Sequence, residues 1–225
     1  RQHRAQQHAQ TAAGDQLVSG WLPPSLRRWW DRRQLREARW APLFEPASGA
    51  EVVSLDMETT SLDVATAEVL SIAAVPVDAG GVRLSERFVR LVRSERDFGI
   101  ESIRVHRILP GESAIAGSLD TALDELLTWL GPRPILGYYV AFDAGVLSRL
   151  SRARHGFDLP QRRVELATVF EAARRHRHAG REPDLRLESI AADLGIPLMG
   201  RHTALGDAVS VGLCYAALLR ERGRG

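Results

Sequence analysis

Short apolar runs separated by turn-forming residues fill the middle of the chain, a pattern typical of a mixed α/β domain. Three consecutive strands are predicted at 52–57, 67–77 and 82–92. The turn Ala79-Gly80-Gly81 lies between the second and the third, so these two strands should form a hairpin. With a fourth strand predicted at 135–140, the chain can form one sheet with this hairpin at one side.

Apolar residues at helical spacing mark the first long helix of this domain. Ser118 is placed to cap it and Gly131-Pro132 ends it. The residues that share its apolar face are Leu119, Ala122, Leu123, Leu126, Leu127 and Leu130. The later helices predicted from the same pattern are one that carries Val146, Leu147 and Leu150 and three at 164–178, 187–194 and 203–220. The order β-β-β-α-β-α-α-α predicts a mixed sheet flanked by helices.

An N-terminal extension precedes this domain in our interpretation, which assigns 1–48 to the extension and 49–225 to the domain. A polar tail leads into a helix rich in tryptophan and arginine, with Ser25 as its N-cap, that runs to Trp40. Its apolar residues are Leu26, Trp29, Trp30 and Trp40. They either pack the helix onto the domain, or residues 20–45 offer a surface to a protein partner, to nucleic acid or to a membrane.

Composition excludes several classes of protein. The chain has 225 residues, 44% of them hydrophobic, which is enough for one medium domain with a sizeable core and excludes a disordered or fibrous protein. A single cysteine cannot form a disulfide within the chain, and no apolar stretch approaches the roughly 20 residues of a transmembrane helix. These features predict a cytoplasmic protein without a transmembrane segment.

Charge is unevenly distributed along the chain although the net charge is only +2. All 30 basic residues are arginine, so the number of arginines alone says little about nucleic acid. Residues 49–148 carry a charge of −7 and residues 149–186 a charge of +5. This segregation indicates either two solvated faces or a cation-binding site beside a surface for the phosphate backbone.

Four acidic residues lie at the ends of predicted strands and helices. Asp56 and Glu58 are two residues apart on one strand and therefore share a face. Asp143 and Asp207 each lie near the start of a helix, and His202 precedes Asp207 by five positions. A solvated strand end and favourable helix dipoles would explain each acid singly. Together they predict a carboxylate cluster suited to Mg²⁺ or Mn²⁺.

Three motifs in this order resemble those of the DnaQ-like, DEDDh-type 3′→5′ exonucleases, which include the proofreading epsilon subunit of bacterial DNA polymerase III. The motifs are Asp56-Met57-Glu58-Thr59-Thr60, Phe142-Asp143 and His202-Thr203-Ala204-Leu205-Gly206-Asp207. The resemblance covers about residues 50–220 and implies an RNase H-like, mixed five-stranded sheet flanked by helices. It also implies a metal-dependent 3′→5′ exonuclease that releases nucleoside 5′-monophosphates from nucleic-acid 3′ ends.

The resemblance further implies a role for each site residue. Asp56 would bridge two divalent cations, Glu58 and Asp207 would hold the ion that activates water, and Asp143 would act mostly through metal-bound water. His202 would take the proton from that water. The residues that would contact substrate are Met57, Thr59, Thr60, Leu62, His106 and Phe142. Taken as residues alone, Thr59 and Thr60 could equally be turn residues and Leu62 and Phe142 core residues.

Departures from the family pattern leave the proposed metal ligands intact, and the first of the following two bears on substrate choice. Tyr138-Tyr139-Val140-Ala141 stands where His-Asn-Ala is common and offers aromatic faces for stacking, and Glu165 stands where an Asp-Thr pair is frequent. The chain ends 18 residues past Asp207, so we expect no polymerase-attachment tail. Two alternatives stay open: a non-catalytic nucleic-acid-binding or polymerase-associated module, and an RNase for very short oligonucleotides. The oligomeric state is not predicted.

Overall fold

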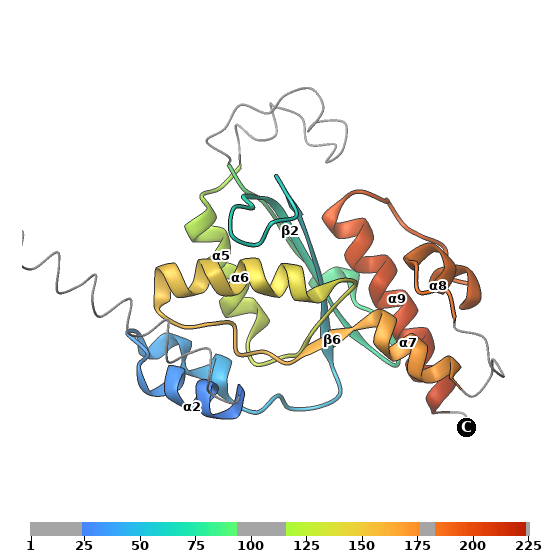
Figure 1. The fold of residues 1–225 in the computed structure, drawn as a ribbon, viewed down its shortest axis with the longest axis horizontal. Coiled ribbons are helices and arrows are strands. Elements are labelled where there is room, and N and C mark those ends of the chain that lie inside the picture. Colours follow the sequence, from blue (N-terminus) through green and yellow to red (C-terminus); the bar gives the residue numbers. More distant parts are fainter. Residues whose placement is uncertain (1–23, 94–115, 176–182, 224–225) are drawn as a thin grey trace, which may run out of the picture.

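The computed structural model describes residues 24–93, 116–175 and 183–223 (Figure 1). Strand β1 (Val52–Thr59) lies at the centre of one mixed sheet whose order is β3-β2-β1-β5-β6. Strand β2 (Val69–Asp78) pairs antiparallel to β1, and β5 (Ile135–Gly137) pairs parallel to it. The mixed sheet flanked by helices confirms the predicted fold class.

The predicted third strand is divided into two pieces. It consists of β3 (Gly81–Val82) and β4 (Phe88–Leu91), separated by the 3₁₀ helix η2 (Leu84–Glu86). Both pieces pair antiparallel with the same edge of β2, so the hairpin is confirmed and the two short strands together occupy one strand position. The sheet therefore has five strand positions although six strand segments build it.

Strand β6 (Arg163–Glu165) corrects the prediction of a helix starting at residue 164. It pairs parallel with β5, and the helix that follows it, α7 (Leu166–Arg174), is shorter than predicted. The end of the predicted segment, at 176–178, lies outside the described residues. The fourth predicted strand is also shorter than expected, because helix α6 already begins at Val140.

Helices cover both faces of the sheet, as Figure 1 shows. One core contains residues from α5 (Leu119–Leu130) and α6 (Val140–His155). The other contains residues from α7, α8 (Leu187–Asp193) and α9 (Ala204–Arg222). The N-caps of α5 and α9 are Ser118, as predicted, and Thr203; their hydroxyls accept hydrogen bonds from the backbone N–H groups of Thr121 and Gly206.

The N-terminal extension is helical but differs from the predicted single helix. Helix α2 (Pro24–Arg33) already includes Ser25, so Ser25 is not its N-cap, and a separate 3₁₀ helix, η1 (Ala38–Phe44), follows. Trp40 in η1 is buried in the core beside α6, whereas Trp29 and Trp30 are about half exposed. Residues 38–44 thus pack into the domain core, and the boundary at residue 48 stays a prediction.

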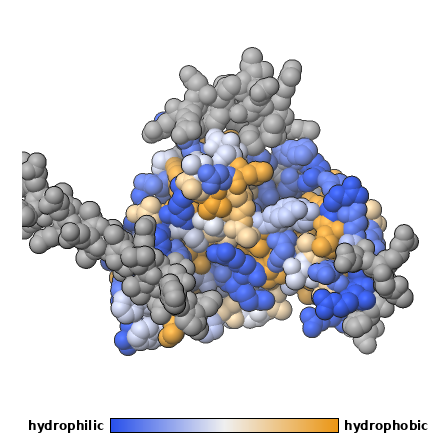
Figure 2. Space-filling model, viewed as in Figure 1, coloured by the Kyte–Doolittle hydropathy of each residue, from blue (hydrophilic) through white to orange (hydrophobic). Residues whose placement is uncertain are grey.

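The surface shown in Figure 2 interleaves hydrophilic and hydrophobic residues. Within the three described ranges, no helix is both long and apolar enough to cross a membrane.

Close packing of α9 on the sheet sets the position of its first turn. A Cβ atom at Gly212 would lie 2.9 Å from Val77 Cγ2, so glycine allows the helix to approach β2 closely. The buried hydroxyl of Ser54 on β1 donates a hydrogen bond to the carbonyl oxygen of Ala208, 2.7 Å away. These contacts hold the residue next to Ala208, Asp207, against the central strand.

Candidate active site

The carboxyl end of β1 presents two acidic side chains on one face of the sheet. Asp56 and Glu58 are partly exposed, while Met57 between them is buried in the hydrophobic core. This alternation follows from the two-residue period of a strand. The Met57 side chain, which was predicted to contact substrate, therefore faces away from the carboxylates and into the core.

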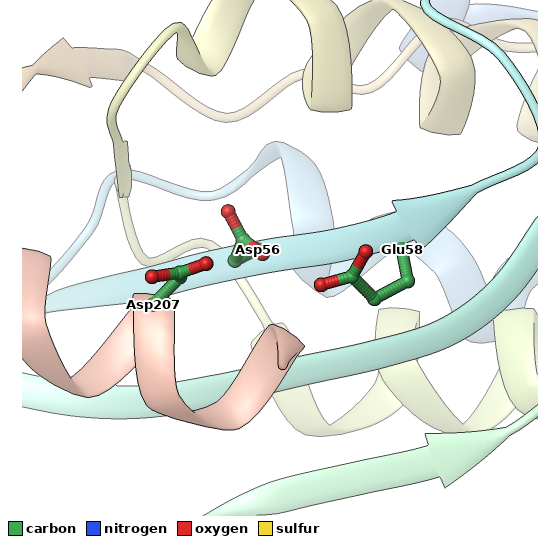
Figure 3. A group of neighbouring side chains, drawn as sticks. All are labelled: Asp56, Glu58 and Asp207. Atoms are coloured by element: carbon green, nitrogen blue, oxygen red, sulfur yellow. The ribbon is translucent and has the colours of Figure 1, made fainter. Parts of the chain in front are cut away.

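Asp207 completes a three-carboxylate group with the strand acids. It lies in the first turn of α9, and Figure 3 shows its side chain next to Asp56, with Glu58 further along the same strand. Carboxylate oxygens of Asp56, Glu58 and Asp207 all lie within 4.8 Å of one another. Hard divalent cations prefer oxygen ligands, and carboxylates are prominent among them. We call these three residues the carboxylate cluster.

Asp143 flanks this cluster from the first turn of α6 and is only 5% exposed. The nearby backbone N–H groups of Asp143 itself and of Met57 lower the pKa of its carboxyl and partly offset the effect of burial. The sheet brings it here because β5, which leads into α6, runs parallel to β1 and ends at the same edge. The four predicted acids thus converge, with three in the cluster and Asp143 at its side.

Burial and mutual repulsion raise the pKa values of two of these acids. For Asp143, burial is the main cause, and the nearby charges of Glu165 and Glu58 add to it, giving a pKa of about 7. For Asp56, burial and then the charges of Asp143, Asp207 and Glu58 raise the pKa well above its usual value. The protein therefore concentrates negative charge here that an added cation would stabilise.

Arg201 supplies a positive charge beside the cluster, and the sequence analysis missed it. Its guanidinium donates to Asp207 Oδ1 at 2.6 Å and to Glu188 Oε1 at 2.7 Å. Its place directly before His202 was the one sequence signal that could have identified it.

His202 has an unusual backbone conformation and an exposed side chain. Its φ angle is 63°, in the left-handed region that non-glycine residues seldom adopt, and its backbone N–H donates to Asp207 Oδ2 at 3.2 Å. Its neighbour Thr203 caps α9. The loop thereby fixes the histidine at the edge of the cluster while leaving the imidazole accessible to a ligand.

The predicted substrate-contacting residues fall into different environments. Thr59 donates through its hydroxyl to the carbonyl of Ser61, and the Thr60 hydroxyl accepts from the backbone N–H of Glu68, so both stabilise the turn after β1. Leu62 is 88% exposed and is therefore not a core residue. Phe142 is partly buried against the core, and His106 lies outside the described residues.

Glu165 organises the start of α6 across a tertiary contact. Its Oε2 accepts from the N–H of Val140 at 2.9 Å, and its Oε1 accepts from the N–H of Tyr139 at 3.2 Å. It also caps α7 through the N–H of Ala167. The departure of Glu165 from the family pattern is visible in the sequence, but its hydrogen-bond partners are not. The pairing of β6 with β5 is what brings Glu165 to the start of α6.

Comparison with known proteins gives a consistent result. A family model described as "Exonuclease" matches residues 53–212. The chain is 28% identical over 177 residues to DNA polymerase III subunit epsilon of Aquifex aeolicus, covering 75% of this chain and 80% of that protein. All the predicted acids and His202 lie within the region that the model matches.

Solved structures share the fold at lower sequence identity. Exonuclease I of E. coli, in complex with a dT13 oligonucleotide, aligns with a TM-score of 0.62 and 22% identity over 78% of this chain. This chain spans only 42% of that longer protein. The nuclease domain of 3′hExo, a DEDDh family member bound to rAMP, aligns with a TM-score of 0.61 and 14% identity, covering 79% of this chain and 95% of that domain.

Proposed function

Because the chain belongs to the exonuclease family, as its motifs predicted, we propose that it removes nucleotides one at a time from the 3′ ends of DNA or RNA. Hydrolysis of the terminal phosphodiester bond would release a nucleoside 5′-monophosphate. The observation that carries this proposal is the carboxylate cluster, with oxygens of Asp56, Glu58 and Asp207 within 4.8 Å of one another at the carboxyl end of β1.

The donor set fits Mg²⁺ or Mn²⁺. Three carboxylates gathered at one edge of the sheet, one of them with a raised pKa, provide hard oxygen ligands and an excess of negative charge. We propose that Asp56, Glu58 and Asp207 hold divalent cations, that Asp143 contributes from beside them, and that two ions bind. When bound, such ions supply positive charge to the scissile phosphate and lower the pKa of water.

His202 is our candidate for the general base. Its imidazole is exposed at the edge of the cluster, while the bond from its backbone to Asp207 fixes its main chain. An imidazole can take up and release a proton near neutral pH, which is what a general base must do. Thr59, Thr60, Leu62 and Phe142 surround the end of β1 and the start of α6, and we propose that they contact the 3′-terminal nucleotide.

The test is a time course on single strands of DNA and RNA with the same sequence, each labelled at its 5′ end. With Mn²⁺ or Mg²⁺ the labelled strand should shorten stepwise, and EDTA should stop the reaction. Asp207→Asn should abolish turnover, and His202→Ala should slow it about 10²–10⁴-fold. Asp78→Asn is the matched control, because Asp78 pairs with Arg83 at the opposite end of β2 and should leave activity unchanged.

The same experiment distinguishes the alternatives. Full activity in EDTA, or in Asp207→Asn, would exclude the proposed mechanism. Binding without turnover would identify a non-catalytic module, and a strong preference for RNA dinucleotides over longer strands would identify a short-oligonucleotide RNase.

The proposal extends to location and partners. We propose a cytoplasmic enzyme, in keeping with its likeness to a DNA polymerase III subunit. Leu26, Trp29 and Trp30 on α2 are exposed, and Arg33 stacks over the Trp29 ring at 4.2 Å, which makes this helix our candidate surface for a protein partner. Loss of partner binding in Trp30→Ala, without loss of nuclease activity, would support this assignment.

A further inference from the structure

A hollow of about 410 Å³ lies at the start of α6, beside the proposed catalytic site. Tyr138, Tyr139, Phe142 and Leu185 form much of its wall, and Glu165 is also part of it. Its size is within the range of pockets that bind small ligands or parts of larger ones. Phe142 directly precedes Asp143, so the hollow and Asp143 share the first turn of α6.

Tyr139 is held in a conformation that keeps its ring in solvent. The residue is the N-cap of α6 and has φ 60° and ψ 37°, the left-handed conformation that is unfavourable for a non-glycine residue. The two hydrogen bonds from Tyr139 N–H and Val140 N–H to Glu165 stabilise this geometry. The side chain is 71% exposed. Backbone strain that displays a large aromatic ring beside a candidate active site points to a ligand for that ring.

Tyr138 fixes the second wall of the hollow. Its hydroxyl donates to the carbonyl oxygen of Leu185 at 3.0 Å, and its ring packs edge-on against Tyr139, with the ring centroids 4.6 Å apart. One tyrosine is therefore anchored and supports the other, which has an open face. This is the arrangement of a stacking platform.

The charge and shape of the hollow favour the binding of a nucleobase over the binding of a phosphate group. The Glu165 carboxylate would repel a phosphate, and its two oxygens already accept from backbone N–H groups. Aromatic walls bind the flat face of a nucleobase by stacking, whatever the base. We propose that Tyr139, supported by Tyr138, binds an unpaired nucleobase of the substrate strand next to the 3′-terminal nucleotide. This inference rests on the proposed function and deepens it, because it predicts that the enzyme acts on single-stranded 3′ ends.

The test compares two substrates that differ in whether they reach the hollow. One is a single-stranded oligonucleotide of about a dozen nucleotides, and the other is the p-nitrophenyl ester of thymidine 5′-monophosphate, which has no second base. Tyr139→Asn removes the ring while keeping a residue that tolerates the left-handed conformation. It should raise KM for the oligonucleotide about 5- to 150-fold and leave kcat/KM for the ester within about twofold of wild type.

Two further variants control for other effects. Tyr139→Phe keeps the ring and should bind the oligonucleotide nearly as well as wild type. Leu84→Ala removes another exposed apolar side chain, on η2, and should change neither substrate. Thermal melting of each variant checks that the fold is intact.

Three results would overturn the inference. They are an unchanged oligonucleotide KM in Tyr139→Asn, an equal loss on both substrates, and a loss in Tyr139→Phe as large as that in Tyr139→Asn. If the wild type hydrolyses neither substrate, the proposed function fails. The base contact is then tested by fluorescence anisotropy, where an oligonucleotide affinity of Tyr139→Asn equal to that of wild type would overturn it.

Discussion

Replacing Asp143 with asparagine should make the metal-free protein more stable than wild type above about pH 7. The buried carboxyl of Asp143 has its pKa raised from 3.8 to about 7, mainly by burial. The folded protein therefore keeps a proton that the unfolded chain releases, and the free energy of unfolding falls as the pH rises between these values. The stabilising effect of this proton is complete below about pH 4 and is lost above about pH 7.

The size of the expected difference in unfolding free energy follows from the interval between the two pKa values of Asp143. Each pH unit corresponds to about 1.4 kcal/mol for one proton, so the interval from 3.8 to about 7 corresponds to about 4 kcal/mol. Asparagine stays neutral, and the exchange of a buried carboxyl for an amide costs about 1 kcal/mol in polar interactions. The variant should thus be slightly less stable than wild type near pH 4 and about 3 kcal/mol more stable near pH 8. The substitution also removes one of the charges that raise the pKa of Asp56. The measured difference in stability therefore includes the effects on both Asp143 and Asp56.

Urea denaturation in EDTA, followed by circular dichroism at several pH values, measures this difference. Asp78→Asn is the control, because Asp78 lies at the end of β2 opposite the carboxylate cluster. This variant should not change from less stable to more stable than wild type as the pH rises. A difference between Asp143→Asn and wild type that stays constant from pH 4 to pH 8 would refute the reasoning, since it would mean that Asp143 does not carry a raised pKa. Mn²⁺ at about a hundred times its Kd should add about 2.7 kcal/mol to the wild type.

Two further substitutions test how the loop before α9 supports the cluster. Arg201→Gln removes the guanidinium that contacts Asp207 Oδ1, so Mn²⁺ should bind about 3- to 10-fold more tightly in a titration followed by electron paramagnetic resonance; weaker binding would show that Arg201 positions Asp207 instead. In Gly206→Ala the new Cβ would lie 2.2 Å from the carbonyl oxygen of Gly200, so melting and activity assays should show a loss of about 1–3 kcal/mol of stability together with lower activity. Gly223→Ala, where the nearest atom is 3.7 Å away, should show neither change.

The parts of the fold that the sequence predicted are those with a strong local signal. Strand β1, the hairpin and the helix face of α5 each follow from apolar periodicity and from turn or cap residues. The acids at 56 and 58 share a face because of strand geometry, which needs no tertiary information.

The parts that the sequence missed depend on contacts between distant segments. Strand β6 is only three residues long, and it is a strand because it pairs with β5, which no local pattern reveals. The break between β3 and β4 lies at the edge of the sheet, where η2 interrupts the pairing with β2. Strand β5 ends at Gly137 because α6 begins at Val140. The left-handed Tyr139 depends on Glu165, 26 residues later in the chain. Local propensity could not predict these features because tertiary pairing overrides it.

The distribution of charge along the sequence suggests that segment 149–186 binds phosphates, but the ion pairs in the structure do not favour that role. Several arginines of the basic segment 149–186 pair with carboxylates of the protein itself: Arg154 with Asp120 and Asp124 on α5, and the buried Arg174 with Glu221 on α9. These pairs tie helices together and leave less of that segment's charge for phosphates. At the cluster, by contrast, three carboxylates lie together and the guanidinium of Arg201 pairs with one of them, Asp207, so negative charge is in excess. The excess negative charge repels a phosphate until cations offset it. The metal dependence that we propose therefore rests on the arrangement of the acids and not on the overall net charge of +2.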